Sequence, residues 1–245
     1  MTNPAHTTQA LAARLLPLLD LTSLGEDDTP ARIEAMCVRA LASGLPAAVC
    51  IYPEHITTAR RALGESAVKV ATVVNFPDGG SDPARVERET RRALAAGADE
   101  IDLVLPWAAL QGGDLATARA VVLAARKACG KDHALKLILE TGQLTSAQIR
   151  AASELGVEAG VDFLKTSTGK VAVNATVEAG AIMLDVIAAH GGRCGFKAAG
   201  GIRSPADAAL YLDLARARLG DGWITPAHFR IGASALYDAL LPLLA

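Results

Sequence analysis

The chain has 245 residues, 51% of them hydrophobic, and its formal net charge at pH 7 is -2. This length suits one large α/β domain, and the hydrophobic content is enough for a sizeable core. This net charge argues against a basic surface for nucleic acid, and no apolar run reaches the roughly 18 residues of a membrane span. We therefore expect the protein to bind neither nucleic acid nor a membrane.

The N-terminal segment and the cysteines predict a protein of the cytoplasm. Residues 1–10 lack the basic and then apolar layout of a secretory signal, so we expect a flexible tail there and a cytoplasmic location. The cysteines are widely spaced and form no CxxC pair, which argues against a zinc site and a disulfide framework. They are Cys37, Cys50, Cys129 and Cys194. We expect all of them to be reduced thiols.

Short apolar segments alternate with longer helical ones along the whole chain. In order, the eight segments are LLDLT near Asp20, AAVCIY near Cys50, KVATVVN from Lys69, EIDLVL near Asp102, LKLILE near Lys136, DFLKTS, GFKAAG from Gly195 and RIGAS from Arg230. This alternation predicts βαβ units and a parallel sheet, and its length favours a (β/α)8 TIM barrel over an open doubly wound sheet. No linker or change of composition marks a second domain, so we expect a single domain over residues 1–245.

Three predicted helices have clear start signals, in which a capping residue precedes a proline. The pairs are Thr29-Pro30, Asp82-Pro83 and Ser204-Pro205. Proline is favoured at the first helical position, so each pair predicts a helix that begins at the proline.

The five histidines do not gather at predicted strand ends, where a metal ion in such a barrel would need its ligands. His6 lies in the tail, His55 and His190 in or just after predicted helices, and His133 and His228 before strands. We expect surface or loop positions for all five, and no metal site.

Polar residues at the ends of the predicted strands are the candidates for chemistry, because a TIM barrel carries its active site there. They are Asp20, Cys50, Asn75, Asp102, Lys136, Glu140, Lys165, Thr168, Lys197 and Ser234. One strand-end lysine alone would be expected to reach solvent. Three lysines that interrupt apolar strands on neighbouring segments, together with an aspartate, favour catalysis instead.

These side chains predict a class I aldolase. One amine attacks a carbonyl, a second amine lowers the pKa of the first by repulsion, and a carboxylate moves protons. The pattern alone would fit either Lys165 or Lys197 as the nucleophile. It also leaves open another lysine-dependent aldolase on a different phosphosugar, or a barrel that binds a phosphorylated metabolite without turnover.

Three glycine turns after predicted strands favour a phosphate site, because glycine lets backbone amides approach an anion and a following helix adds its dipole. They are Thr168-Gly169-Lys170, Gly200-Gly201 and Gly232-Ala233-Ser234. One such turn would be weak support, but three in successive units match the place where TIM barrels often hold phosphate.

Seven strings resemble the deoxyribose-phosphate aldolase family, in order, from about Leu16 to Leu240. They are LLDLT, AVCIYP, GADEIDLVLP, LKLILETG, DFLKTSTGKVAVNAT, GFKAAGGIRS and RIGAS, of which KTSTGK and the GFKxAGG pattern are the most specific. The resemblance implies a class I aldolase that reversibly cleaves 2-deoxy-D-ribose 5-phosphate into D-glyceraldehyde 3-phosphate and acetaldehyde, without a metal or cofactor. A homodimer or a homotetramer is the expected assembly, and the sequence does not choose between them.

The resemblance also implies roles for individual residues. It makes Lys165 the Schiff-base lysine, Lys197 the neighbour that perturbs it, and Asp102 the proton-transfer carboxylate. Positions that match the lining of the substrate pocket are Asp20, Cys50, Lys136 and Thr168, and those that match the phosphate site are Gly169, Lys170, Gly200, Gly201, Gly232 and Ser234. Asp20 and Lys136 are also expected to support the lysine network.

Two departures from the family pattern bear on the substrate site. Ala235 stands where some members have a second serine, so one hydroxyl contact to phosphate is expected to be missing. The sequence ends in LLPLLA, without the tyrosine-ended tail that some members use in proton transfer. Water or another group is then expected to transfer the proton in place of that tyrosine.

Overall fold

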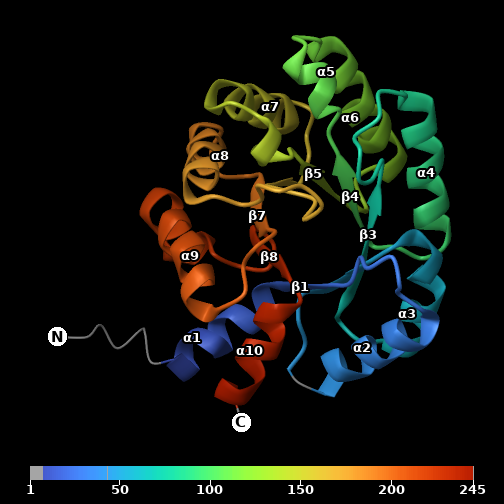
Figure 1. The fold of residues 1–245 in the computed structure, drawn as a ribbon, viewed down its shortest axis with the longest axis vertical. Helices are drawn as coiled ribbons and strands as arrows, with labels where there is room; N and C mark the ends of the chain where they lie inside the picture. The colour runs from blue at the N-terminus through green and yellow to red at the C-terminus, as the bar shows by residue number, and fades with distance from the viewer. Residues whose placement is uncertain (1–7, 43, 245) are drawn as a thin grey trace.

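A closed parallel barrel forms the centre of the molecule (Figure 1). The computed structural model describes residues 8–42 and 44–244, and within them eight strands pair in sequence order, with β1 hydrogen-bonded to both β2 and β8. The strands are β1 (Leu19–Thr22), β2 (Ala48–Ile51), β3 (Lys69–Val74), β4 (Glu100–Val104), β5 (Ala134–Ile138), β6 (Phe163–Lys165), β7 (Gly195–Ala199) and β8 (Phe229–Ala233). The predicted (β/α)8 fold is confirmed.

Helices follow each strand and form the outer ring that Figure 1 shows. The α-helices are α1 (Thr8–Leu15), α2 (Pro30–Ala42), α3 (Ile56–Leu63), α4 (Pro83–Ala95), α5 (Trp107–Gln111), α6 (Leu115–Cys129), α7 (Ser146–Glu158), α8 (Val177–Ala189), α9 (Pro205–Leu219) and α10 (Ala235–Leu244). Short 3-10 helices are η2 (Leu16–Leu18), η3 (Pro53–His55), η4 (Thr141–Gln143) and η5 (Asp221–Trp223). Among residues 8–42 and 44–244, none of the helices has the length and apolar character needed to span a membrane.

The prediction of a flexible tail over residues 1–10 is wrong for residues 8–10. Helix α1 begins at Thr8 and packs against α9 and α10, so residues 8–10 belong to the folded ring. Ala12 and Leu15 provide the reason, because both are fully buried and give this helix an apolar face. Residues 1–7 of the predicted tail lie outside the described residues.

The three predicted helix starts are confirmed. Helix α4 begins at Pro83 after Asp82, whose carboxylate accepts hydrogen bonds from two amides of the first turn. Helix α9 begins at Pro205 after Ser204, which forms a reciprocal capping box with Asp207. These bonds satisfy amides that would otherwise lack partners at a helix start.

The prediction of a surface or loop position is wrong for His55. This residue ends η3 and is 6% exposed, because the short helix turns its side chain inward rather than toward solvent. His6 lies outside the described residues.

Small apolar side chains fill one part of the barrel interior. Ala48 and Cys50 of β2 pack with Ala71 and Val73 of β3 in a cluster separate from the large core between strands and helices. Because these side chains are short, the opposite strands can send long charged side chains toward the barrel axis. The short side chains of β2 and β3 therefore leave room inside the barrel for a group of charged side chains.

Candidate active site

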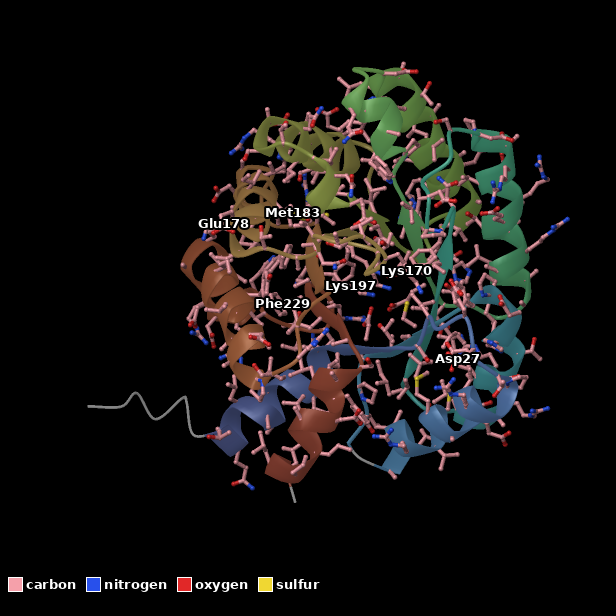
Figure 2. All side chains as sticks on the ribbon, viewed as in Figure 1. Asp27, Lys170, Glu178, Met183, Lys197 and Phe229 are labelled. Carbon is pink, nitrogen blue, oxygen red and sulfur yellow. The ribbon has the colours of Figure 1, made fainter. Side chains whose placement is uncertain are left out.

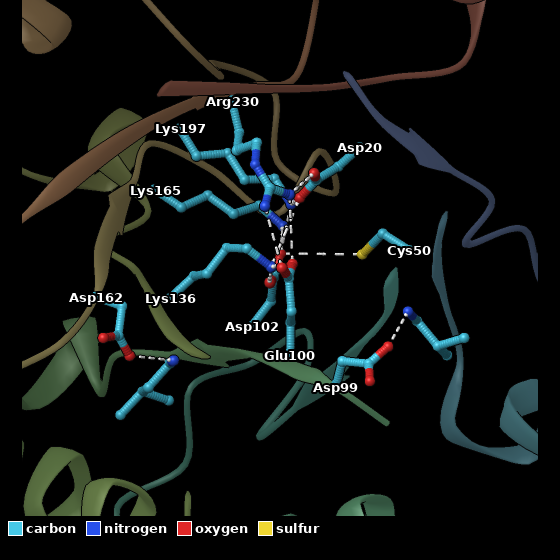
Figure 3. Close-up of polar contacts among 12 residues, drawn as sticks. Asp20, Cys50, Asp99, Glu100, Asp102, Lys136, Asp162, Lys165, Lys197 and Arg230 are labelled. Carbon is cyan, nitrogen blue, oxygen red and sulfur yellow. Dashed lines mark hydrogen bonds and ion pairs between the residues drawn. The ribbon is translucent and has the colours of Figure 1, made fainter. Parts of the chain in front are cut away.

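Three lysine ammonium groups meet at one buried carboxylate (Figure 3). The Nζ atom of Lys136 lies 2.8 Å from Oδ1 of Asp102. The Nζ atoms of Lys165 and Lys197 lie 2.7 and 2.8 Å from its other oxygen, Oδ2. Two cations that share one carboxylate oxygen are close neighbours, so the lysines predicted to interact are brought together.

Strand register explains why these side chains converge. Asp102 pairs with Lys136 across β4 and β5, and Lys165 pairs with Lys197 across β6 and β7. Side chains alternate between the two faces of a strand, so partners in register that face inward meet near the barrel axis.

A deeper layer of charges supports this centre, and two of its members were not among the predicted site residues. Arg230 donates to Oδ1 of Asp20 at 2.6 Å and to Oε1 of Glu100 at 3.1 Å. Glu100 also pairs with Lys136 at 2.6 Å, and Asp20 with Lys197 at 2.5 Å. We call these seven buried side chains the charge network; they are Asp20, Glu100, Asp102, Lys136, Lys165, Lys197 and Arg230.

The period of two along a strand was the available signal for Glu100, whereas Arg230 is explained by strand register. Glu100 stands two residues before Asp102 on β4 and therefore shares its inward face. Arg230 stands opposite Lys197 in the β7–β8 register. Both residues lie near the start of their strands, whereas the predicted candidates came from the C-terminal strand ends.

Neighbouring charges hold Asp102, Lys136 and Lys197 in their ionised forms. Burial would raise the pKa of Asp102, but Lys136, Lys165 and Lys197 outweigh burial and keep this pKa well below its ordinary value. Burial would likewise lower the pKa of Lys136 and of Lys197, but the neighbouring carboxylates raise both. Lys197 is therefore a persistent positive neighbour of Lys165.

Three of the predicted pocket residues lie in the buried layer around the lysines. Asp20, Cys50 and Lys136 are fully buried and are absent from the wall of the cavity above them. Asp20 and Lys136 belong to the charge network, and the Cys50 thiol lies 3.9 Å from Oδ2 of Asp102. Burial and the Asp102 charge raise the pKa of that thiol, so it stays protonated. Their positions within the strands, rather than at the strand ends, account for this depth.

A cavity of about 290 Å³ opens directly above the network. Lys165 lines it and is 2% exposed, whereas Lys136 and Lys197 are fully buried beneath it. Residues of the predicted phosphate turns that line the same cavity are Thr168, Gly169, Lys170, Gly200, Gly201, Gly232, Ala233 and Ser234. The structure therefore gathers the candidate nucleophile and all three turns around one space, and Figure 2 shows Lys170 and Lys197 in the middle of the helical ring.

Arg203 also lines this cavity and was not predicted. It follows the Gly200-Gly201 turn in the string GGIRS, so a basic residue within three positions of a glycine pair was the available signal. The Nζ atom of Lys170 donates to the backbone oxygen of Leu24 at 2.6 Å, which brings its charge across the mouth of the cavity. Ala235 adds a methyl group to the wall in place of a hydroxyl.

Two glycines are required by the space around them. A side chain on Gly200, whose φ is 91°, would place its Cβ 2.6 Å from Cβ of Asn174. A Cβ on Gly232 would lie 3.0 Å from Cε of Lys197. Gly232 and Ala233 belong to β8, so the predicted turn begins two residues later, at Ser234, and Gly232 leaves room for the lysine stem.

Comparison with known proteins identifies the family. The family model of the DeoC/LacD family aldolases matches residues 15–240. The chain belongs to this family. It is also 48% identical to the deoxyribose-phosphate aldolase of Agrobacterium fabrum, over all of this chain and 96% of the relative.

Solved structures of similar fold include family members and more distant proteins. One is the apo form of a Toxoplasma gondii protein that is assigned as a deoxyribose-phosphate aldolase. It has a TM-score of 0.88 and 26% identity, and the match covers 96% of this chain and 97% of that one. The tetrameric deoxyribose phosphate aldolase of Aeropyrum pernix has a TM-score of 0.73 and 24% identity, covering 96% of this chain and 91% of that one, and shows the fold alone. For this DeoC/LacD family aldolase, the described residues contain no group of three or more His, Cys, Asp or Glu side chains placed to hold a metal ion.

Proposed function

We propose that this chain reversibly cleaves 2-deoxy-D-ribose 5-phosphate to D-glyceraldehyde 3-phosphate and acetaldehyde, with Lys165 forming the covalent bond to substrate. The observation that carries the proposal is the placement of Lys165, which lines the cavity while its ammonium group shares Asp102 with Lys197. Membership of an aldolase family and a relative named deoxyribose-phosphate aldolase support the substrate.

Access to the cavity supports Lys165 as the amine that attacks the substrate. Lys136 contacts Glu100 and Asp102, and Lys197 contacts Asp20 and Asp102, so both are enclosed by carboxylates. Lys165 borders the cavity, where a substrate carbonyl can reach its amine.

The reaction follows from these positions. The neutral amine of Lys165 attacks the aldehyde carbon of the open-chain sugar, and loss of water gives a protonated imine. This imine accepts the electron pair of the C2–C3 bond as the C3 hydroxyl loses its proton, which releases D-glyceraldehyde 3-phosphate. The enamine that remains is protonated at carbon, and water then releases acetaldehyde and the amine. Asp102 and Lys197 are proposed to move protons at the nitrogen end.

Two measurements test the function together. Purified protein should convert 2-deoxy-D-ribose 5-phosphate into the two named products, identified by mass spectrometry. Borohydride added with acetaldehyde should fix a two-carbon adduct on the peptide that contains Lys165. Cleavage of a different phosphosugar in preference, or an adduct on another lysine, would overturn the proposal.

The phosphate group is proposed to bind at the other end of the cavity. The amides of the Gly169 and Gly200-Gly201 turns, the N-terminus of α10, and the side chains of Lys170 and Arg203 give this end a positive character. Ser234 precedes α10 and is exposed in the same wall. We propose that its hydroxyl donates to a phosphate oxygen.

Replacing Ser234 by aspartate should weaken capture of the phosphorylated sugar. The new carboxylate would repel the phosphate, and we expect KM for 2-deoxy-D-ribose 5-phosphate to rise by about tenfold or more, which corresponds to ~1.4 kcal/mol. Steady-state kinetics should show a much smaller change for unphosphorylated deoxyribose. Ser234→Asn is the matched control of similar size without charge. An equal loss on both substrates would show that phosphate binds elsewhere.

We expect the activity to be independent of metal ions, because the protonated imine supplies the electron withdrawal that a metal would otherwise provide. Dialysis against EDTA should leave cleavage of 2-deoxy-D-ribose 5-phosphate unchanged. Loss of activity that zinc restores would contradict this expectation.

Assembly and location are proposed as well. We propose a homodimer or a homotetramer, and light scattering on the purified protein distinguishes the two. We also propose a cytoplasmic location, because all four cysteines are buried free thiols, as a reducing compartment keeps them. Cell fractionation tests the second proposal.

A further inference from the structure

Glu140 is a fully buried carboxylate that lies outside the charge network. It follows β5 with φ and ψ of 57° and 58°, the left-handed region, which costs a residue other than glycine about 1 kcal/mol or more. Its two neighbours fix this conformation, because the amides of Leu139 and Thr141 donate to the backbone oxygens of Lys165 and Thr166 at 2.9 and 3.0 Å. The chain thus continues its pairing with β6 on both sides while Glu140 takes the strained position.

The Glu140 side chain is held entirely by Thr168 in the described part of the chain. Oε2 accepts a hydrogen bond from the Thr168 hydroxyl at 2.5 Å, and Oε1 accepts one from the Thr168 amide at 3.3 Å. The same hydroxyl oxygen accepts from the amide of Lys170 at 3.0 Å. Thr168 lines the cavity together with Lys165, so the hydroxyl connects the cavity with the buried carboxylate.

The two buried acids near Lys165 differ in their readiness to hold a proton. Burial raises the pKa of Glu140, against the opposing hydrogen bonds from Thr168 and the charge of Lys165. Asp102, between three lysines, has its pKa held well below the ordinary value. Of the two carboxylates, Glu140 therefore holds a proton more readily, which suits it to take one from a carbon atom.

We propose that Glu140, acting through the hydroxyl of Thr168, exchanges the proton at the carbon atom of the enamine formed on Lys165. This inference rests on the proposed function, since it assigns a step of that reaction. It gives Glu140 and Thr168 the task of carbon protonation and leaves proton transfer at nitrogen and oxygen to the charge network.

The step balances in both directions. In synthesis, a C–H bond of the imine methyl group breaks, its electron pair forms the C=C bond of the enamine, and the iminium nitrogen loses its positive charge. The Thr168 oxygen takes that proton while its own hydroxyl proton passes to the Glu140 carboxylate. In cleavage, the proton returns from Glu140 to Thr168, and the Thr168 proton passes to the enamine carbon.

Glu140→Gln tests the step, because glutamine can still accept the Thr168 hydrogen bond through its amide oxygen but cannot take up the proton. Acetaldehyde is incubated with the enzyme in D₂O, and exchange of its methyl hydrogens is followed by NMR. We expect the exchange to slow by about a hundredfold or more. Borohydride trapping of acetaldehyde on Lys165 should proceed at the wild-type rate, since imine formation does not use Glu140.

Substitutions of Thr168 test the relay without touching the carboxylate. Thr168→Val keeps the shape of the side chain and should slow exchange as Glu140→Gln does, whereas Thr168→Ser should retain it. The double variant should be no slower than either single one, because the two groups act as a unit. Glu87→Gln is the matched control on α4, where Glu87 pairs with Arg91 at the surface.

The outcomes separate this inference from the proposed function. Wild-type exchange in Glu140→Gln or in Thr168→Val would overturn the relay. An equal fall in trapping and exchange would also overturn the relay. Such a result would show that Glu140 only positions the Thr168-Gly169-Lys170 turn, which would affect both measurements. If the wild-type protein itself traps no acetaldehyde, the proposed function fails first.

Discussion

Replacing Lys165 by arginine is expected to abolish both the borohydride adduct with acetaldehyde and the cleavage of 2-deoxy-D-ribose 5-phosphate. Arginine keeps a positive charge near Asp102, but its guanidinium group does not deprotonate in proteins and forms no imine. Loss of covalent catalysis should reduce the cleavage rate to the background of the assay. Mass mapping of the reduced protein and a product assay measure the two effects on the same sample.

Lys197→Arg is the control that separates the two lysines. It keeps a positive neighbour for Lys165, so some trapping should remain on the Lys165 peptide even if the rate falls. Both variants retain the formal charge of the network. Any difference between them therefore does not come from a change in net charge. An adduct on Lys197 in the wild-type protein would reverse the two roles, and undiminished trapping in Lys165→Arg would rule out Lys165 as the nucleophile.

Asp102→Asn should give the largest loss of stability among substitutions in the barrel interior. The variant leaves Lys136, Lys165 and Lys197 without the carboxylate that all three contact. Breaking a buried ion pair by removal of one partner typically costs about 3–5 kcal/mol, and we expect a loss in this range at pH 7. Urea denaturation measures this loss, and the cleavage activity should fall as well, because Asp102 is proposed to transfer protons near Lys165.

The stability difference between the wild-type protein and Asp102→Asn should depend on pH and should shrink as the pH falls. The pKa of Asp102 is depressed in the folded state, so its contribution to stability is complete above the unfolded-state pKa of about 3.9. That contribution disappears as the pH falls from there toward the folded-state pKa. The free energies of unfolding of wild-type protein and Asp102→Asn should therefore converge below about pH 4. A constant difference between pH 7 and pH 3 would show that Asp102 contributes through shape rather than charge.

The sequence predicted the barrel and its helix starts because each signal is local. Alternation of short apolar strands with helices, and a capping residue before proline, depend on neighbours within a few positions. The same local signals placed Lys165 and the glycine turns on strand ends, and these residues do share one cavity. Their roles in chemistry and in phosphate binding stay predictions.

Local sequence signals could not predict how deep a side chain lies within the barrel. Asp20, Cys50 and Lys136 were expected in the wall of the pocket, but they lie below it because register and tilt decide how far inward a strand residue sits. Arg230 and Glu100 meet across strands 130 residues apart in sequence. Such a pair follows from closure of the sheet, which no local pattern contains.

The positive mouth of the cavity affects how substrate arrives. The chain carries a net charge of -2, so an anion at long range meets a weakly repulsive molecule. Lys170, Arg203 and the start of α10 oppose that repulsion at the opening, above a barrel partly lined by small apolar side chains. Walls of low dielectric concentrate electric field lines into such an opening and raise the rate of encounter with an anion. Ionic strength should consequently act on the capture of a phosphorylated sugar far more than on the breaking of its carbon–carbon bond.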